Sequence, residues 1–203
     1  MRKFMIIWFM FVFILGCSFK EEHKKDVLDN SYVITVPDEE TVKKEIQKDL
    51  EYFLYKYNRN WNYINKKLFV EVVDAGQKEF EIDYRIVMAI ISIESNYKIQ
   101  ARGRNKNSID YGLCQINSKY IDKRYKIAEK YLKKNGFKCS NSIYDIGKNI
   151  FSCYIYLHDM SDIPELIYFK DYIDAYNKGV RGALRNKTND DYYNRFMKEF
   201  MEI

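Results

Sequence analysis

Apolar side chains recur at helical spacing from Glu39 onward. Gly and Pro number only 8 and 2 among 203 residues, too few turn residues for a sandwich or barrel of many short strands. Two apolar stripes flank the turn-like residues 58–60 and predict a helical hairpin. The stripes are Val42, Ile46, Leu50, Phe53 and Tyr57, and then Trp61, Ile64, Leu68, Val72 and Ala75. The expected fold class is therefore mainly α.

Further helical patterns follow the hairpin. A third helix is expected from about Asp83, a suitable N-cap, to about Asn96. Residues 103–117 are rich in Gly, Asn and Ser and indicate a loop or a small hairpin. The remaining helical segments are expected at residues 119–134, 145–159, 164–177 and 190–201, the last one packing through Tyr193, Phe196, Met197 and Phe200.

The first residues have the pattern of a secretory signal. Arg2 and Lys3 precede an uncharged apolar run, residues 4–16, which ends at a small residue, Gly16. The run is shorter than the ~20 residues that a membrane-spanning helix needs. We therefore predict a signal peptide at residues 1–16.

The end of this signal resembles a bacterial lipobox, in which the next residue, Cys17, becomes lipidated. The alternative is an ordinary cleaved signal followed by an incidental cysteine. Residues 17–38 are largely polar and charged, as expected of a solvated tether between a lipid and a folded domain.

Glu94 is the clearest candidate for a chemically active residue. On the third predicted helix it shares a face with Val87, Ile90 and Ile91. Apolar surroundings disfavour the charged form of a carboxyl group and raise its pKa, so such a group can stay protonated and donate its proton. The alternative is a glutamate at a helix end that faces solvent or bonds a backbone amide.

Three short motifs, in order, place Glu94 in a family context. They are Glu94-Ser95, Gly112-Leu113-Cys114-Gln115 and Ala175-Tyr176-Asn177. Together they resemble the catalytic domain of the soluble lytic transglycosylases (SLT), over roughly Leu68 to Phe200. The resemblance implies a mainly α, lysozyme-like (goose-type/SLT) domain with a small loop or β-hairpin region beside the active-site cleft. We assign residues 39–65 to an N-terminal helical extension and residues 66–203 to the catalytic domain.

The resemblance also implies roles for residues. Glu94 would protonate the glycosidic oxygen between N-acetylmuramic acid and N-acetylglucosamine and then deprotonate the 6-hydroxyl of the muramic acid, leaving a 1,6-anhydro end. Ser95, Gln115, Tyr176 and Asn177 would line the cleft and hold the sugar.

The stretch from Asp110 to Ser118 also resembles hen-type lysozymes, in which the corresponding aspartate is the second catalytic carboxylate. This leaves a muramidase, with Glu94 and Asp110 acting together, as an alternative; otherwise Asp110 braces the loop. Tyr111 and Asn117 in this stretch are expected to contact substrate. A third alternative is a non-catalytic envelope lipoprotein that binds glycan.

The remaining predictions concern cysteines, cofactors and partners. With Cys17 lipidated, Cys139 and Cys153 are the preferred disulfide pair, because Cys114 replaces a buried apolar residue. No Cys/His spacing suits zinc and no Gly-rich phosphate loop is present, so no metal or cofactor is expected. The net charge of +5 is scattered, which argues against nucleic acid. Expected partners are peptidoglycan strands, a membrane through the N-terminal lipid, and a secretion or envelope assembly. The expected location is the cell envelope, at the periplasmic face of the outer membrane or the outer face of the plasma membrane.

Overall fold

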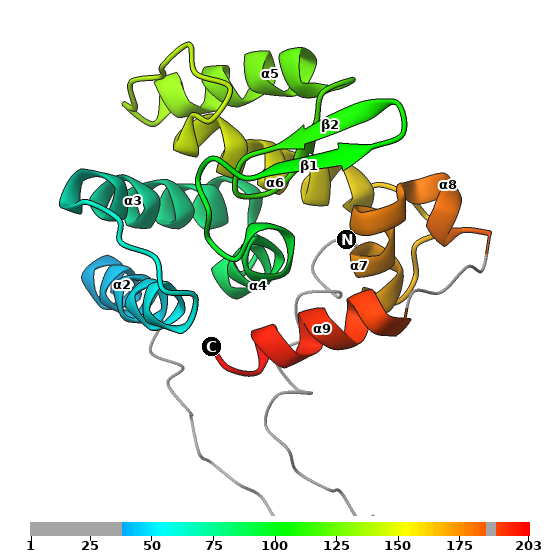
Figure 1. The fold of residues 1–203 in the computed structure, drawn as a ribbon, viewed down its shortest axis with the longest axis horizontal. Helices are drawn as coiled ribbons and strands as arrows, with labels where there is room; N and C mark the ends of the chain where they lie inside the picture. The colour runs from blue at the N-terminus through cyan, green and yellow to red at the C-terminus, as the bar shows by residue number, and fades with distance from the viewer. Residues whose placement is uncertain (1–37, 186–189) are drawn as a thin grey trace, which may run out of the picture. The chain divides into compact units, whose positions relative to one another are not determined.

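Eight helices and a three-stranded antiparallel sheet make up residues 38–185 and 190–203, which the computed structural model describes (Figure 1). The predicted signal peptide, Cys17 and the tether up to residue 37 lie outside the described residues. In chain order the elements are α2 (Glu39–Lys56), α3 (Tyr63–Phe80), α4 (Tyr84–Ser95), β1 (Arg102–Asn105), β2 (Ser108–Tyr111), β3 (Ile116–Asn117), α5 (Ile121–Lys134), α6 (Ile146–Ser161), α7 (Phe169–Lys178), α8 (Val180–Ala183) and α9 (Asp190–Phe200).

Local capping explains where several helices begin. The side chains of Asp38, Asn62, Asp83 and Asp145 each accept a hydrogen bond from a backbone N–H in the first turn of α2, α3, α4 and α6 respectively. Such bonds satisfy backbone donors that have no partner within the helix. None of the described helices combines the length and the apolar character that crossing a membrane requires.

Helix α4 lies at the centre of the helical packing, in contact with α3, α6 and α9 (Figure 1). Its apolar residues Val87 to Ile91 are fully buried. Helices α3 and α6 approach each other closely at Gly76, where a Cβ atom would come within 2.3 Å of the Tyr154 ring. The core is therefore centred on α4, with α3 and α6 packed against it.

The small sheet follows α4 and has the strand order β1-β2-β3, with antiparallel pairing throughout. Asp110 pairs with Gly103 on one side and with Asn117 on the other. This register places Asp110 between Gly103 and Asn117 in a three-stranded sheet. From the Gly-rich and Asn-rich sequence we expected only a loop or a small hairpin here.

The mainly helical fold class with a small sheet is confirmed, with local differences. Ile64, predicted to lie on the apolar stripe of the second helix, is 72% exposed, because α3 turns Phe69, Val73 and other residues toward its neighbours instead. Helix α7 begins at Phe169, after a turn that contains Pro164. The boundary assigned between residues 65 and 66 falls inside α3, and the described residues belong to one compact unit.

Helix α2, assigned to the extension, contributes directly to the core. Ile46, Leu50, Phe53 and Leu54 are buried, and the Phe53 ring stacks on Tyr97, just after α4, with ring centroids 5.1 Å apart. Removing α2 would expose this apolar surface. The extension is therefore a structural part of the folded unit.

This packing predicts that Phe53→Ala lowers the free energy of unfolding by about 3–5 kcal/mol, because it leaves a cavity in the core. Urea denaturation followed by circular dichroism would measure the change. Tyr55→Ala on the same helix is the control, because Tyr55 is 88% exposed; its effect should stay within about 0.5 kcal/mol. Equal effects of the two variants would contradict the role assigned to α2.

Candidate active site

Glu94 lies in the last turn of α4 and is half-buried. The helix ends at the next residue, Ser95, and the C-cap residue Asn96 adopts the left-handed conformation (φ 48°, ψ 43°) and donates its N–H to the Ser92 carbonyl. The following residue, Tyr97, also has positive φ and is fully buried. The chain therefore turns sharply and fixes the end of the helix that carries the carboxyl group.

The Glu94 carboxyl group is surrounded by groups from distant parts of the chain. The hydroxyl of Tyr192 on α9 donates a hydrogen bond to Glu94 Oε1 at 2.6 Å, and Tyr192 is only 5% exposed. Burial raises the pKa of Glu94 above its ordinary value, and the nearby charge of Asp110 acts in the same direction. The Tyr192 hydrogen bond and the charge of Arg195 lower that pKa but do not cancel the rise. Glu94 is thus a carboxyl group with a raised proton affinity.

Asp110, on β2, is held by asparagine side chains. Asn105 donates through Nδ2 to Asp110 Oδ2, and Asn117 donates through Nδ2 to Asp110 Oδ1, both at 2.6 Å. Asn117 also donates to Ser108 Oγ at 2.8 Å. Both carboxylate oxygens therefore take part in bracing the sheet, while the charge of Asp110 still acts on Glu94.

The Gly112–Gln115 motif forms a turn between β2 and β3 that Asn149 of α6 holds in place. Asn149 Oδ1 accepts the N–H of Cys114 at 2.7 Å, and its Nδ2 donates to the carbonyl of Tyr111 at 2.9 Å. Gly112 has φ +80°, and a Cβ atom there would lie 2.4 Å from Asn149 Nδ2. The glycine thus permits both the backbone conformation and the close approach of Asn149.

Gln115 has positive φ (49°), and its side chain folds back over the turn. Its Nε2 donates to the carbonyl of Gly112 at 2.8 Å. A Cβ atom on Gly103 would lie 2.6 Å from Gln115 Oε1 and 3.7 Å from the Cβ of Asp110. Gln115 therefore packs against β1, next to Asp110.

Tyr176, from α7, contacts the same turn. Its hydroxyl donates to the carbonyl of Cys114 at 2.9 Å, and its ring lies beside Tyr156, with centroids 5.5 Å apart. Burial raises the pKa of Tyr176 well above its usual value, and the nearby Glu94 acts in the same direction. Tyr176 is therefore close to both the turn and Glu94, whereas the adjacent Asn177 is largely exposed.

Two other predicted residues have structural partners. The buried Ser95 hydroxyl donates to the carbonyl of Ile91 within its own helix at 3.0 Å. The Tyr111 ring packs edge-on against Tyr144, with centroids 5.8 Å apart. The structure thus gathers Glu94, Asp110, Gln115 and Tyr176 around the signature turn, while Ser95 bonds within α4.

The predicted Cys139–Cys153 disulfide is not formed: Cys114, Cys139 and Cys153 are free thiols in the structure. Cys153 is buried in α6, near the buried Cys114. Cys139 lies in the connection after α5 and is half-buried.

Tyr192 was missed at the sequence level. The prediction for the last helix named Tyr193 as a packing residue, but the buried residues of α9 include Tyr192, Phe196 and Phe200. Spacing of four residues between these three could have identified this face. The partner of Tyr192 could not be read this way, because it lies 98 residues away in the sequence.

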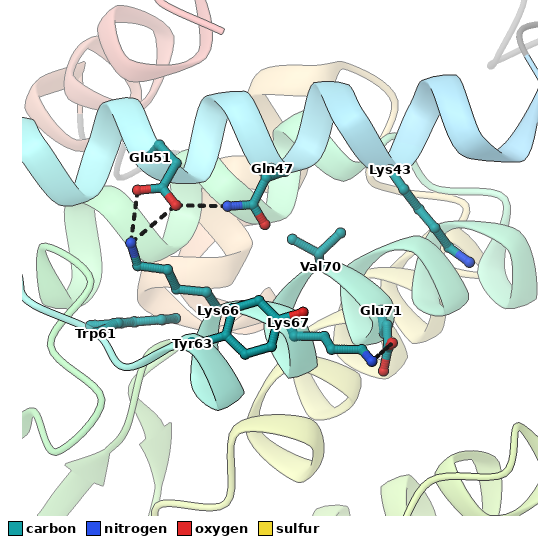
Figure 2. A pocket seen from close by; sticks show the side chains of 9 residues that line it. All are labelled: Lys43, Gln47, Glu51, Trp61, Tyr63, Lys66, Lys67, Val70 and Glu71. Atoms are coloured by element: carbon teal, nitrogen blue, oxygen red, sulfur yellow. Dashed lines mark hydrogen bonds and ion pairs between the residues drawn. The ribbon is translucent and has the colours of Figure 1, made fainter.

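A separate groove of about 390 Å³ lies between α2 and α3, away from the predicted site residues (Figure 2). Lys66 bridges to Glu51 at its edge, Gln47 bonds the same carboxylate, and Val70 contributes an apolar surface. Within residues 38–185 and 190–203, no three His, Cys, Asp or Glu side chains are grouped so that they could hold a metal ion.

The family model described as "Transglycosylase SLT domain" matches residues 71–198. The match covers more than half of the chain, so the protein belongs to the SLT transglycosylase domain family, and its helical fold with a small sheet is the lysozyme-like fold expected of that family. Membership indicates a transglycosylase-type enzyme with peptidoglycan glycan as its substrate. A search of curated proteins found no match.

The surroundings of Glu94 predict opposite pKa changes in two variants. Tyr192→Phe removes a hydrogen bond that favours the charged carboxylate, so the pKa of Glu94 should rise. Asp110→Asn removes a like charge, so the pKa should fall. Carbon-detected NMR titration of the Glu94 carboxyl group would measure both. Asp122→Asn, on the exposed surface of α5, should leave this pKa unchanged; shifts of the same sign in the first two variants would refute the arrangement.

Proposed function

We propose that this protein is a peptidoglycan lytic transglycosylase in which Glu94 is the catalytic acid and then the base. The observation that supports this most directly is the half-buried Glu94 carboxyl group, with its raised pKa, beside the signature turn. Residues 66–203 supply the catalytic domain in this proposal, and α2 completes its core.

In the first step, protonated Glu94 donates its proton to the glycosidic oxygen as the bond from that oxygen to the anomeric carbon breaks. The electron pair of the broken bond stays with the leaving oxygen, which becomes a hydroxyl of N-acetylglucosamine. A raised pKa keeps the proton available near neutral pH, which general acid catalysis requires.

In the second step, the Glu94 carboxylate removes the proton from the 6-hydroxyl of the same muramic acid. The 6-oxygen bonds to the anomeric carbon, giving a 1,6-anhydro ring and returning Glu94 to its protonated form without consuming water. Tyr192 would hold Oε1 and stabilise the carboxylate between the two steps, because its hydroxyl already donates to that atom.

Gln115 and Tyr176 would help to position the sugar, with Asn177, Tyr111 and Asn117 as further predicted contacts. Asp110 is proposed as a bracing group, because both of its oxygens accept asparagine hydrogen bonds. The nearby charge of Asp110 is the observation that favours the alternative, a muramidase that adds water at the anomeric carbon.

The products distinguish these reactions. Purified sacculi treated with the enzyme should release muropeptides with anhydro ends, which are one water lighter than hydrated ends and identifiable by mass spectrometry. Hydrated reducing ends would instead identify a muramidase. Binding to sacculi without soluble products would identify a non-catalytic glycan-binding protein.

Glu94→Gln should lower product release by at least about 10²-fold, because glutamine cannot exchange the proton. Glutamine can still accept the Tyr192 hydrogen bond through its Oε1, so the melting temperature should stay close to that of the original chain. Glu129→Gln is the matched control, since Glu129 pairs with Lys133 on α5. Full activity of Glu94→Gln would exclude the proposed mechanism.

We also propose that residues 1–16 are a lipoprotein signal, that Cys17 carries the lipid and that residues 17–38 form a tether in the cell envelope. Detergent phase partitioning of the expressed chain should recover it in the detergent phase, and Cys17→Ser should move it to the aqueous phase because the anchor is lost. Cys139→Ser controls for loss of a thiol. Aqueous partitioning of the original chain would refute the anchor.

A further inference from the structure

We propose that α2 is a positioning element of the active site: Lys56 and Tyr57 hold Glu199 of α9, and so keep Tyr192 of the same helix against Glu94. The inference rests on the proposed function for the role of Glu94. It assigns a catalytic purpose to a helix that the family match, residues 71–198, does not include.

Three donors converge on one oxygen of Glu199, which is only 8% exposed. Lys56 Nζ and the Tyr57 hydroxyl each lie 2.8 Å from Glu199 Oε2, and Ser92 Oγ donates to the same atom at 2.5 Å. Lys56 and Tyr57 come from the end of α2, and Ser92 from α4. A buried carboxylate needs such partners to offset its lost hydration, so this cluster joins three helices.

Helix α9 is bonded to the last turn of α4 at three points along its length. Tyr192 donates to Glu94, Arg195 Nη2 donates to the carbonyl of Ile93 at 2.9 Å, and Glu199 accepts from Ser92. Tyr192 and Glu199 are seven residues apart, so they lie on the same face of a continuous helix. A displacement of α9 at Glu199 would therefore also displace the Tyr192 hydroxyl from Glu94.

The polar contacts of α2 with α9 are separate from its apolar packing. Burial of Ile46, Leu50 and Phe53 already attaches α2 to the core. Beyond this apolar contact, Lys56 and Tyr57 direct polar groups at Glu199, a buried carboxylate on the helix that supplies Tyr192. The geometry therefore links the end of α2 to the catalytic carboxyl group through a single helix.

The experiment uses the purified full-length chain and uncrosslinked glycan strands. Lys56→Met with Tyr57→Phe keeps the side-chain bulk but removes two of the three donors to Glu199. We expect kcat to fall roughly tenfold with little change in KM, as for a small displacement of a catalytic group. The basic limb of the kcat profile should move to higher pH, because weakening the Tyr192 hydrogen bond raises the pKa of Glu94. The other groups that act on Glu94, Asp110 on β2 and Arg195 on α9, are unchanged.

A matched control lies on the same helix. Lys44→Met with Tyr55→Phe makes the same two substitutions at exposed positions of α2 and should leave kcat and the pH profile unchanged. The single variant Tyr57→Phe retains the Lys56–Glu199 ion pair and replaces the double variant if the latter does not fold. Assays are run well below each measured melting temperature.

The decisive comparison repeats the Lys56/Tyr57 change in a Tyr192→Phe background. If Lys56 and Tyr57 act through Tyr192, their substitution should lower kcat less than about twofold in this background. The hydrogen bond from Tyr192 to Glu94, which they hold in place, is already absent there. An undiminished, additive loss would overturn the inference and leave only a structural role. If the original chain releases no product from glycan, the proposed function fails; if it is active and the two substitutions leave kcat unchanged, only this inference fails.

Discussion

Burial of α4 is the constraint on which the rest of the structure depends. Among residues 84–95 all but Arg85, Ile93 and Glu94 are buried, and α3, α6 and α9 pack around the helix. A carboxyl group at the end of such a helix loses hydration, and the pKa of Glu94 rises for that reason first. The chemistry of the site therefore follows from the packing of the core.

The polar groups at this end of α4 are satisfied by segments far away in the sequence. From α9, Tyr192 donates to Glu94, Arg195 donates to the carbonyl of Ile93, and Glu199 accepts from Ser92 of α4. Buried polar groups without partners raise the free energy of the folded state. These contacts therefore fix the position of α9 relative to α4. Opposing influences act on the pKa of Glu94. Burial and the charge of Asp110 favour the protonated carboxyl group, while the Tyr192 hydrogen bond and the charge of Arg195 favour the carboxylate. A group that must first give and then take a proton benefits from this balance.

Much of the local structure could be predicted, because it depends on neighbouring residues. Asp83 as N-cap and Asn96 as the last residue of the third helix agree with the observed ends of α4. Ile64 shows where this reasoning fails. Helical spacing indicated an apolar stripe, but α3 contacts both α2 and α6, and the positions that face these neighbours leave Ile64 exposed.

By itself the sequence determined the helical class, most helix boundaries and the motifs that carry Glu94, Gln115 and Tyr176, because periodicity and capping act over a few residues. Tertiary structure decided which side chains meet: Tyr192 with Glu94, Asn149 with the signature turn, and Cys153 with Cys114 in place of the expected Cys139. The physical reason is that spacing defines the buried face of an element, whereas the packing of the whole core decides which other element covers that face.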